Sequence, residues 1–236
     1  MSTWAARRFW KQTTTAQTDG GFEVLLDGRR VRTPAKAALI LPTQGMATAL
    51  AAEWEAQDEK IAPETMPFTR SANAAIDKVA PQRAEVIEML AAYGDSDLLC
   101  YRADSPEELI ARQAQQWDPA LDWAETELGA RLHPRTGVIH APQDAQALQR
   151  LTEPLTAATD FEIAALHDLI SLSGSLVLGL ACARGWASPE SIWNVSQLDE
   201  SWQAEQWGAD EEADAQTALK RAAFLHASEF YRLSRA

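Results

Sequence analysis

The residues best suited to chemistry lie near the end of the chain, in the segment LDESWQAEQWGADEEA from Leu198 to Ala213. Carboxylates crowd this segment and the position just beyond it, around two tryptophans: Asp199, Glu200, Glu205, Asp210, Glu211, Glu212 and Asp214. Paired carboxylates can act as general acid and general base when one of them is buried and both face a substrate. A pair such as Glu200 and Glu205 in an interdomain cleft would make the protein a hydrolase.

A structural interpretation accounts for the later acids equally well. Gly208 follows Trp207 as a glycine follows the end of a helix, and Asp210 then stands where a helix N-cap belongs. Glu211 and Glu212 fall in the first turn, where the helix dipole favours negative charge. The three earlier acids are not explained in this way.

Trp202 has two possible roles. It lies three positions from both Asp199 and Glu205, so on a helix carboxylates bracket its ring on adjoining turns, as around an aromatic anchor in a protein interface. Its spacing to Val195 and Leu198 also fits a residue that faces the core. The spacing alone leaves both roles open.

Other catalytic and metal motifs are missing from the sequence. The histidines are scattered, no Cys-x-x-Cys occurs, and neither a phosphate-binding glycine loop nor a Gly-x-Ser-x-Gly elbow is present. Cys100 and Cys182 lie in apolar runs, which indicates buried thiols in a reducing compartment. We therefore expect no metal ion and no cofactor.

Charge and hydropathy argue against a nucleic-acid-binding protein and against a membrane-spanning one. A formal charge of -13 argues against binding nucleic acid, whose phosphates require a basic surface. The sequence has no lysine or arginine from Gly185 to Leu219, whereas the first residues are rich in both. The longest apolar run, LVLGLACA at 176–183, is too short to span a membrane and predicts a buried helix.

Strands are predicted first along the chain. FEVLL and RRVRT form a hairpin joined by Asp27-Gly28, because this dipeptide tolerates the positive φ angles of a type I′ turn. ALIL at 38–41 is expected to be a third strand. A helix capped by Thr43 follows, and Met46, Leu50 and Trp54 recur on it at four-residue spacing as one buried stripe.

Beyond the proline-containing connection EKIAPETMPFT the pattern is almost wholly helical. Proline at a first helical position and glycine after a last one mark most of the boundaries. We predict an α+β protein with an amino-terminal α/β domain at 1–72 and a helical domain at 73–236. Its helices are expected at about 82–93, 106–117, 119–128, 142–158, 161–184, 189–207 and 210–233; LLCY at 98–101 fits a short strand or a helical turn.

The motifs in their order resemble one protein family. RRFWK, GFEVLLDGRRVRTPAK, EWEAQ, IAPETMPFT, YGDSDLLCYR, WDPALDW, SGSLVLGLA and LDESWQAEQWGADEEA are similar to segments of the assembly chaperones of the ATP synthase catalytic head, the F1 sector, that receive its alpha subunit. The resemblance runs from about Arg7 to Ala213. Its order is far more specific than any single motif.

This resemblance implies a small amino-terminal α/β layered domain followed by a larger orthogonal helical bundle. It also implies a protein without enzymatic activity that binds unassembled alpha subunit (protein) and keeps it soluble until beta replaces the chaperone. We expect this protein to be a monomer. We assign partner contact to the matching residues, hereafter the acidic motif: Asp199, Glu200, Trp202, Glu205, Trp207 and Asp210. Trp54, in EWEAQ, is expected to serve folding.

The start of the motifs at Arg7 leaves little room for an import presequence, so we expect a bacterial, cytoplasmic member of this largely mitochondrial family. The hydrolase remains the alternative hypothesis, and a scaffold without a client of its own is a third. An enzyme of this kind requires a carboxylate in the motif with a strongly raised pKa.

Overall fold

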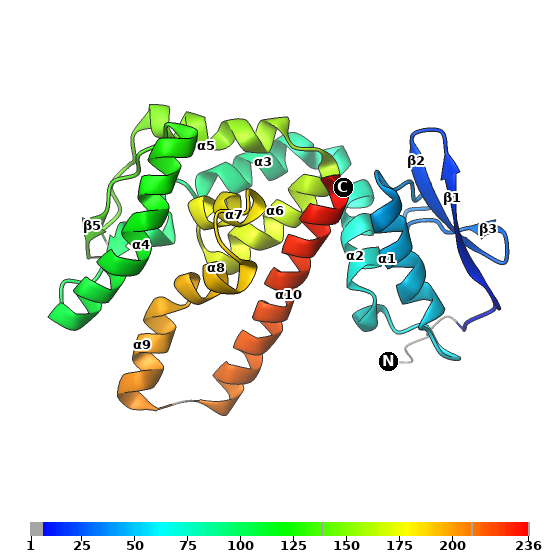
Figure 1. Cartoon of the computed structure of the whole chain (residues 1–236). Coiled ribbons are helices and arrows are strands. Elements are labelled where there is room, and N and C mark those ends of the chain that lie inside the picture. The colour runs from blue at the N-terminus through cyan, green and yellow to red at the C-terminus, as the bar shows by residue number, and fades with distance from the viewer. Residues whose placement is uncertain (1–6, 138, 209, 236) are drawn as a thin grey trace. The chain divides into compact units, whose positions relative to one another are not determined.

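The computed structural model of the chain describes residues 7–137, 139–208 and 210–235 (Figure 1). The chain divides into two compact units. Unit 1 comprises Met1–Arg83 with Thr159–Ala165 and Glu229–Ala236, and unit 2 comprises Ala84–Ala158 with Leu166–Ser228. The predicted α+β fold class is confirmed. The domain boundary predicted between residues 72 and 73 stays a prediction, because the compactness of a unit does not test which segments fold independently.

Unit 1 begins with a three-stranded antiparallel sheet in the order β1-β2-β3. The strands are β1 (Thr13–Thr18), β2 (Gly21–Leu26) and β3 (Arg29–Arg30). The predicted hairpin is confirmed: β2 and β3 pair across Asp27 and Gly28, whose φ angles are 47° and 78°. Strand β1 is not among the predicted elements, because TTTAQT lacks the apolar alternation of a half-buried strand.

The third strand predicted at 38–41 is wrong. Phe22 and Leu41 exchange both backbone hydrogen bonds at 2.8 Å, and Arg32 bridges Ala38, but no continuous ladder joins these two points. Gly21 permits the close approach beside Phe22, since a Cβ atom there would lie 2.2 Å from the Leu41 carbonyl oxygen. The segment is therefore an extended edge held by isolated bridges.

The predicted first helix is present as α1 (Gln44–Glu55), which begins where Thr43 Oγ1 accepts the Met46 N–H. Met46 and Leu50 are fully buried, and Trp54 packs edge-on against Trp10 with ring centroids 5.3 Å apart. The connection that follows is more ordered than predicted. It contains a 3-10 helix (Pro63–Thr65) and the start of α2 (Pro67–Ala74), and a π-helix (Ala75–Val79) and a second 3-10 helix (Ala80–Gln82) follow before the next predicted helix.

Helices dominate the rest of the chain: α3 (Arg83–Ala92), α4 (Glu107–Leu128), α5 (Ala145–Ala157), α6 (Asp160–Ser173), α7 (Leu176–Ala183), α8 (Pro189–Ser196), α9 (Leu198–Trp207) and α10 (Glu211–Arg235). A 3-10 helix (Leu98–Cys100) leads into β4 (Tyr101–Arg102), which pairs in parallel with β5 (Arg135–Thr136). LLCY thus contains both of its predicted alternatives. No helix within the described ranges is both long and apolar enough to cross a membrane.

Three predicted helix boundaries are wrong. The two helices predicted at 106–117 and 119–128 are the single helix α4, which continues through Pro119 because Trp117 and Leu121 are buried on either side of it. The helix predicted at 161–184 breaks into α6 and α7 at Gly174, whose φ is 69°. The helix predicted at 189–207 breaks into α8 and α9 at Gln197, which leaves the helical region of φ and ψ.

Packing inside unit 2 fixes the position of α9. The buried helix α7 contacts α4 and α8, and α8 in turn contacts α9. Trp117 of α4 donates its indole N–H to the Val195 carbonyl oxygen of α8 at 2.9 Å. Leu198, the first residue of α9, is buried. The acidic motif thus begins on a well-anchored helix end.

Candidate partner-binding site

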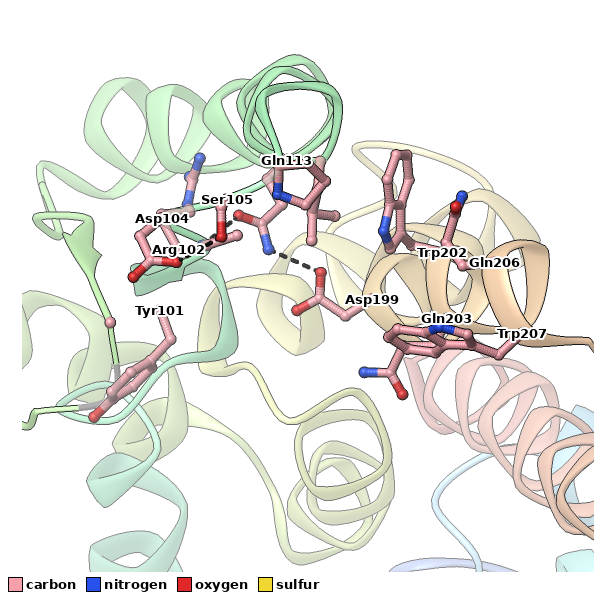
Figure 2. Close-up of a pocket in the computed structure, with 14 residues that line it drawn as sticks. Tyr101, Arg102, Asp104, Ser105, Gln113, Asp199, Trp202, Gln203, Gln206 and Trp207 are labelled. Carbon is pink, nitrogen blue, oxygen red and sulfur yellow. Dashed lines mark hydrogen bonds between the residues drawn. The ribbon is translucent and has the colours of Figure 1, made fainter.

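A groove of about 720 Å³ in unit 2 lies between the first turns of α4, the segment after β4, and α9 (Figure 2). We call it the α4–α9 groove. Its lining is mostly aromatic, amide and apolar, with three charged side chains: Tyr101, Arg102, Ala103, Asp104, Ser105, Pro106, Leu109, Gln113, Gly137, Asp199, Trp202, Gln203, Gln206 and Trp207. Three members of the acidic motif, Asp199, Trp202 and Trp207, line this groove.

Asp199 is half-buried and held from α4. Gln113, only 2% exposed, donates from Nε2 to Asp199 Oδ1 at 2.8 Å, and its own Oε1 accepts the Ala103 N–H at 2.9 Å. A buried amide is costly unless its hydrogen bonds are satisfied, so these two bonds account for a glutamine in the interior. Gln113 is not among the predicted site residues, although it shares the buried stripe of Trp117, Ala120 and Ala124 on α4.

Arg112, the preceding residue of α4, covers Trp202. Its Nη1 atom donates to both carboxylate oxygens of Glu205, at 2.8 and 2.9 Å, and its guanidinium carbon lies 4.8 Å from the Trp202 ring centroid. The hydrogen bond from Arg112 lowers the pKa of Glu205. The sequence around α9 contains no base, but the fold supplies one from α4. Trp202 is half-buried, and its contact with a partner stays a prediction.

Four members of the acidic motif are exposed: Glu200, Glu205, Trp207 and Asp210. Trp207, the last residue of α9, is 81% exposed and points along the mouth of the groove in Figure 2. Glu200 is exposed on the same helix and forms no ion pair among the described residues. A large apolar side chain in this position, beside acidic and amide groups, is typical of an interface residue.

Asp210 caps α10, as predicted. Its Oδ1 atom accepts the backbone N–H groups of Glu212 at 2.9 Å and Ala213 at 3.3 Å. This role satisfies two of the free donors at the helix start. Contact of Asp210 with a partner stays a prediction.

The geometry gives no support to the hydrolase hypothesis. Neither Glu200 nor Glu205 lines the α4–α9 groove, and the pKa of Glu205 is lowered, whereas that hypothesis needs a raised one. Burial raises the pKa of Asp97 to about 6, but this carboxylate accepts the N–H groups of Leu99 and Val177 and ties helix starts together.

The described residues contain no cluster of three or more histidine, cysteine or carboxylate side chains arranged to hold a metal ion. Cys100 and Cys182 are buried free thiols, as predicted, and burial raises the pKa of Cys100 to about 12. A thiol with so high a pKa is inert as a nucleophile at neutral pH.

The chain matches known proteins along most of its length. The family model of the ATP12 chaperone protein matches residues 7–125. Atp12 from Paracoccus denitrificans is 50% identical, and its crystal structure superimposes with a TM-score of 0.95 over 98% of this chain and 99% of that chain. Protein Atu1473 from Agrobacterium tumefaciens is 44% identical, with a TM-score of 0.92 over 98% of this chain and 86% of that one.

The similarity extends to a mitochondrial protein. Protein atp12, mitochondrial, from Schizosaccharomyces pombe is 26% identical over 220 residues, which cover 88% of this chain and 75% of that protein. The fold and the matched motifs define an assembly chaperone of the ATP synthase. The chain belongs to the ATP12 chaperone family.

Proposed function

We propose that this protein binds the unassembled alpha subunit of the ATP synthase and keeps it soluble until alpha pairs with beta. Membership of the family supports a role in assembly, and therefore contact with a subunit of the synthase. We choose this surface as the binding site because Trp207 is 81% exposed at the mouth of a preformed groove. Alpha is the subunit that the motif resemblance implies.

The surface suits a chaperone that must release its client. Trp202 and Trp207 supply aromatic anchors, and the acids Glu200, Glu205 and Asp210, close to them in the sequence, are exposed. Rim charges chiefly raise the association rate and contribute less to the lifetime of a complex. With a net charge of -13, the protein should attract a basic surface over a distance that salt reduces.

We propose further that the protein acts as a monomer in the bacterial cytoplasm and without catalysis. The high similarity to Atp12 from P. denitrificans supports the bacterial setting. The lowered pKa of Glu205 and the structural hydrogen bonds of Asp97 support a role for these carboxylates other than acid or base catalysis.

The test is capture of separately purified alpha and beta subunits by the tagged protein. We expect alpha to be retained, beta to pass through, and added beta to release captured alpha. Trp207→Ala should weaken the capture of alpha while leaving the melting temperature unchanged, because an exposed side chain contributes little to stability. Retention of beta alone, or of neither subunit, would contradict the proposal.

A further inference from the structure

The negative charges that line the α4–α9 groove are not neutralised by paired positive charges among the described residues. Arg102 is directed away from it: Nη2 donates to Asp118 at 2.8 Å, Nε donates to the Leu99 carbonyl at 2.7 Å, and the guanidinium lies 5.3 Å from the Trp117 ring centroid. Asp104 and Asp199 form no ion pair among the described residues. An uncompensated negative charge therefore remains inside the groove.

Asp199 is held in place by its neighbours. The backbone N–H of Ala103 can only donate, so it fixes the Gln113 amide with Oε1 toward Ala103 and Nε2 toward Asp199. The Asp199 Oδ2 atom accepts no hydrogen bond from the described residues. Figure 2 shows this carboxylate beside Gln113, on the helix that also carries Trp202 and Trp207. The groove thus contains a positioned carboxylate with a free oxygen.

Aromatic rings form the walls on either side of this carboxylate. Tyr101 comes from β4, while Trp202 and Trp207 come from α9. Trp202 already has a guanidinium over its ring, that of Arg112. No cation lies over Trp207 within the described part of the chain, and its indole is exposed. Indole faces attract cations, and arginine most often occupies such positions.

We propose that the α4–α9 groove binds an arginine side chain of the client, carried on a segment with apolar neighbours. The guanidinium donates to Asp199 and stacks on the Trp207 indole, and the apolar neighbours pack on Leu109 and Pro106. Arginine fits better than lysine, because its planar fork can donate to a carboxylate and stack on a ring at the same time. This inference rests on the proposed function for the client's identity, but the groove chemistry can be tested without the client.

The first test uses two peptides that differ only in charge, acetyl-Leu-Arg-Ala amide and its citrulline analogue. Citrulline keeps the planar shape of arginine and lacks its charge. We expect the arginine peptide to shift the indole N–H resonances of Trp202 and Trp207 in the full-length protein. The citrulline peptide should bind at least about fivefold more weakly, since hydrogen bonds to charged groups are the stronger ones. Equal shifts from both peptides, or none from either, would overturn the proposal.

The second test uses purified alpha subunit and two matched variants of α9. Asp199→Asn removes the charge of the positioned carboxylate and keeps an oxygen that can accept from Gln113. Glu200→Gln removes the same charge from the next residue, which is exposed and outside the groove. We expect dissociation of alpha to become about tenfold faster in Asp199→Asn, whereas Glu200→Gln should change chiefly the association rate and its salt dependence.

The outcomes separate the two proposals. If alpha binds both variants with unchanged dissociation rates, the arginine site is refuted and the proposed function stands. If alpha does not bind the wild-type protein, the proposed function fails, and the peptide titration still decides the chemistry of the groove. Melting curves of both variants identify any loss of binding that comes from unfolding.

Discussion

An arginine, a tryptophan and a glutamate come together in each unit of the molecule, with opposite consequences. In unit 1, Arg8 lies over the Trp10 ring at 5.3 Å and pairs with Glu55 at 3.0 Å. In unit 2, Arg112 lies over the Trp202 ring at 4.8 Å and pairs with Glu205 at 2.8 Å. Trp10 is 3% exposed, however, whereas Trp202 is half-buried and lines a groove.

The difference lies in what else each arginine contacts. Arg8 also donates to the backbone carbonyls of Trp10, Glu55 and Gln57, and so ties the start of the chain to the end of α1. Among the described residues, Arg112 donates side-chain hydrogen bonds to Glu205 alone, and its guanidinium remains near the surface. One cluster stabilises the fold, and the other holds a tryptophan at the groove that we propose as the partner-binding site.

The largest difference in stability is expected when tryptophan is replaced by arginine in each unit. Trp54→Arg should cost about 3 kcal/mol or more, because it removes a ring packed on Trp10 and brings an unpaired guanidinium against the core. Trp207→Arg should change stability by less than about 0.5 kcal/mol, since its side chain is exposed. Urea denaturation measures both. A Trp54 variant as stable as wild type would place this ring at a binding surface instead.

A second contrast is between the fully buried carboxylate of Asp97 and those of α9, which are half-buried at Asp199 and exposed at Glu200 and Glu205. Burial raises the pKa of Asp97 from 3.8 to about 6, so between these pH values the folded protein binds more protons than the unfolded chain. The contribution of Asp97 to the free energy of unfolding therefore falls as pH rises from about 4 to about 6, by about 3 kcal/mol in total.

The measurement is the free energy of unfolding of wild type and Asp97→Asn across this pH range. Asparagine does not titrate, so the difference between the two proteins should change with pH in the stated direction. A constant difference would show that the surrounding N–H groups keep the pKa of Asp97 at its ordinary value.

Substitutions of Arg8 and Arg112 should differ less in their effect on stability. Arg8→Gln should cost about 2 kcal/mol, because three backbone carbonyls and Glu55 lose their donor. Arg112→Gln should lower the melting temperature less, since it breaks an exposed ion pair. It should instead free the Trp202 ring and change its fluorescence. Equal melting temperatures would remove the distinction between the two clusters.

The smallest stability effects concern two neighbouring acids of α9. Glu200→Lys should lie within about 0.5 kcal/mol of wild type, whereas Asp199→Lys should cost about 1 kcal/mol, because Gln113 loses its acceptor. The double-lysine variant should bind alpha much more weakly than wild type. The loss of affinity should exceed any loss that comes from unfolding of the variant or that added salt causes in the wild-type protein. Melting and binding at low and high salt check both parts, and unchanged affinity would exclude these acids from the interface.

Local chemistry makes several features predictable from the sequence. The Asp27-Gly28 turn, the Thr43 cap and the Asp210 cap each depend on neighbouring residues, and all three are present. The break at Gly174 and the passage of α4 through Pro119 are not predictable in this way, because burial on distant elements decides whether a helix stops or continues.

The α4–α9 groove could not be predicted from the sequence for the same reason. The sequence predicts the acidic motif as a unit, but the fold brings to it residues from far along the chain: Arg112 lies 93 positions from Glu205, and Gln113 lies 86 positions from Asp199. Hydrogen bonds of this separation leave no local pattern. A glutamine within the buried stripe of α4 is the one sequence signal that could indicate a polar contact there.

Hydroxyl-radical footprinting can show whether α9 presents Trp207 to the alpha subunit, as we propose. In the free protein Trp207, at 81% exposure, should be oxidised rapidly, whereas Trp10, at 3%, should be protected. Saturating alpha subunit should protect Trp207 and leave the low reactivity of Trp10 unchanged. Formation of a stable complex in which Trp207 is oxidised as fast as in the free protein would contradict the claim.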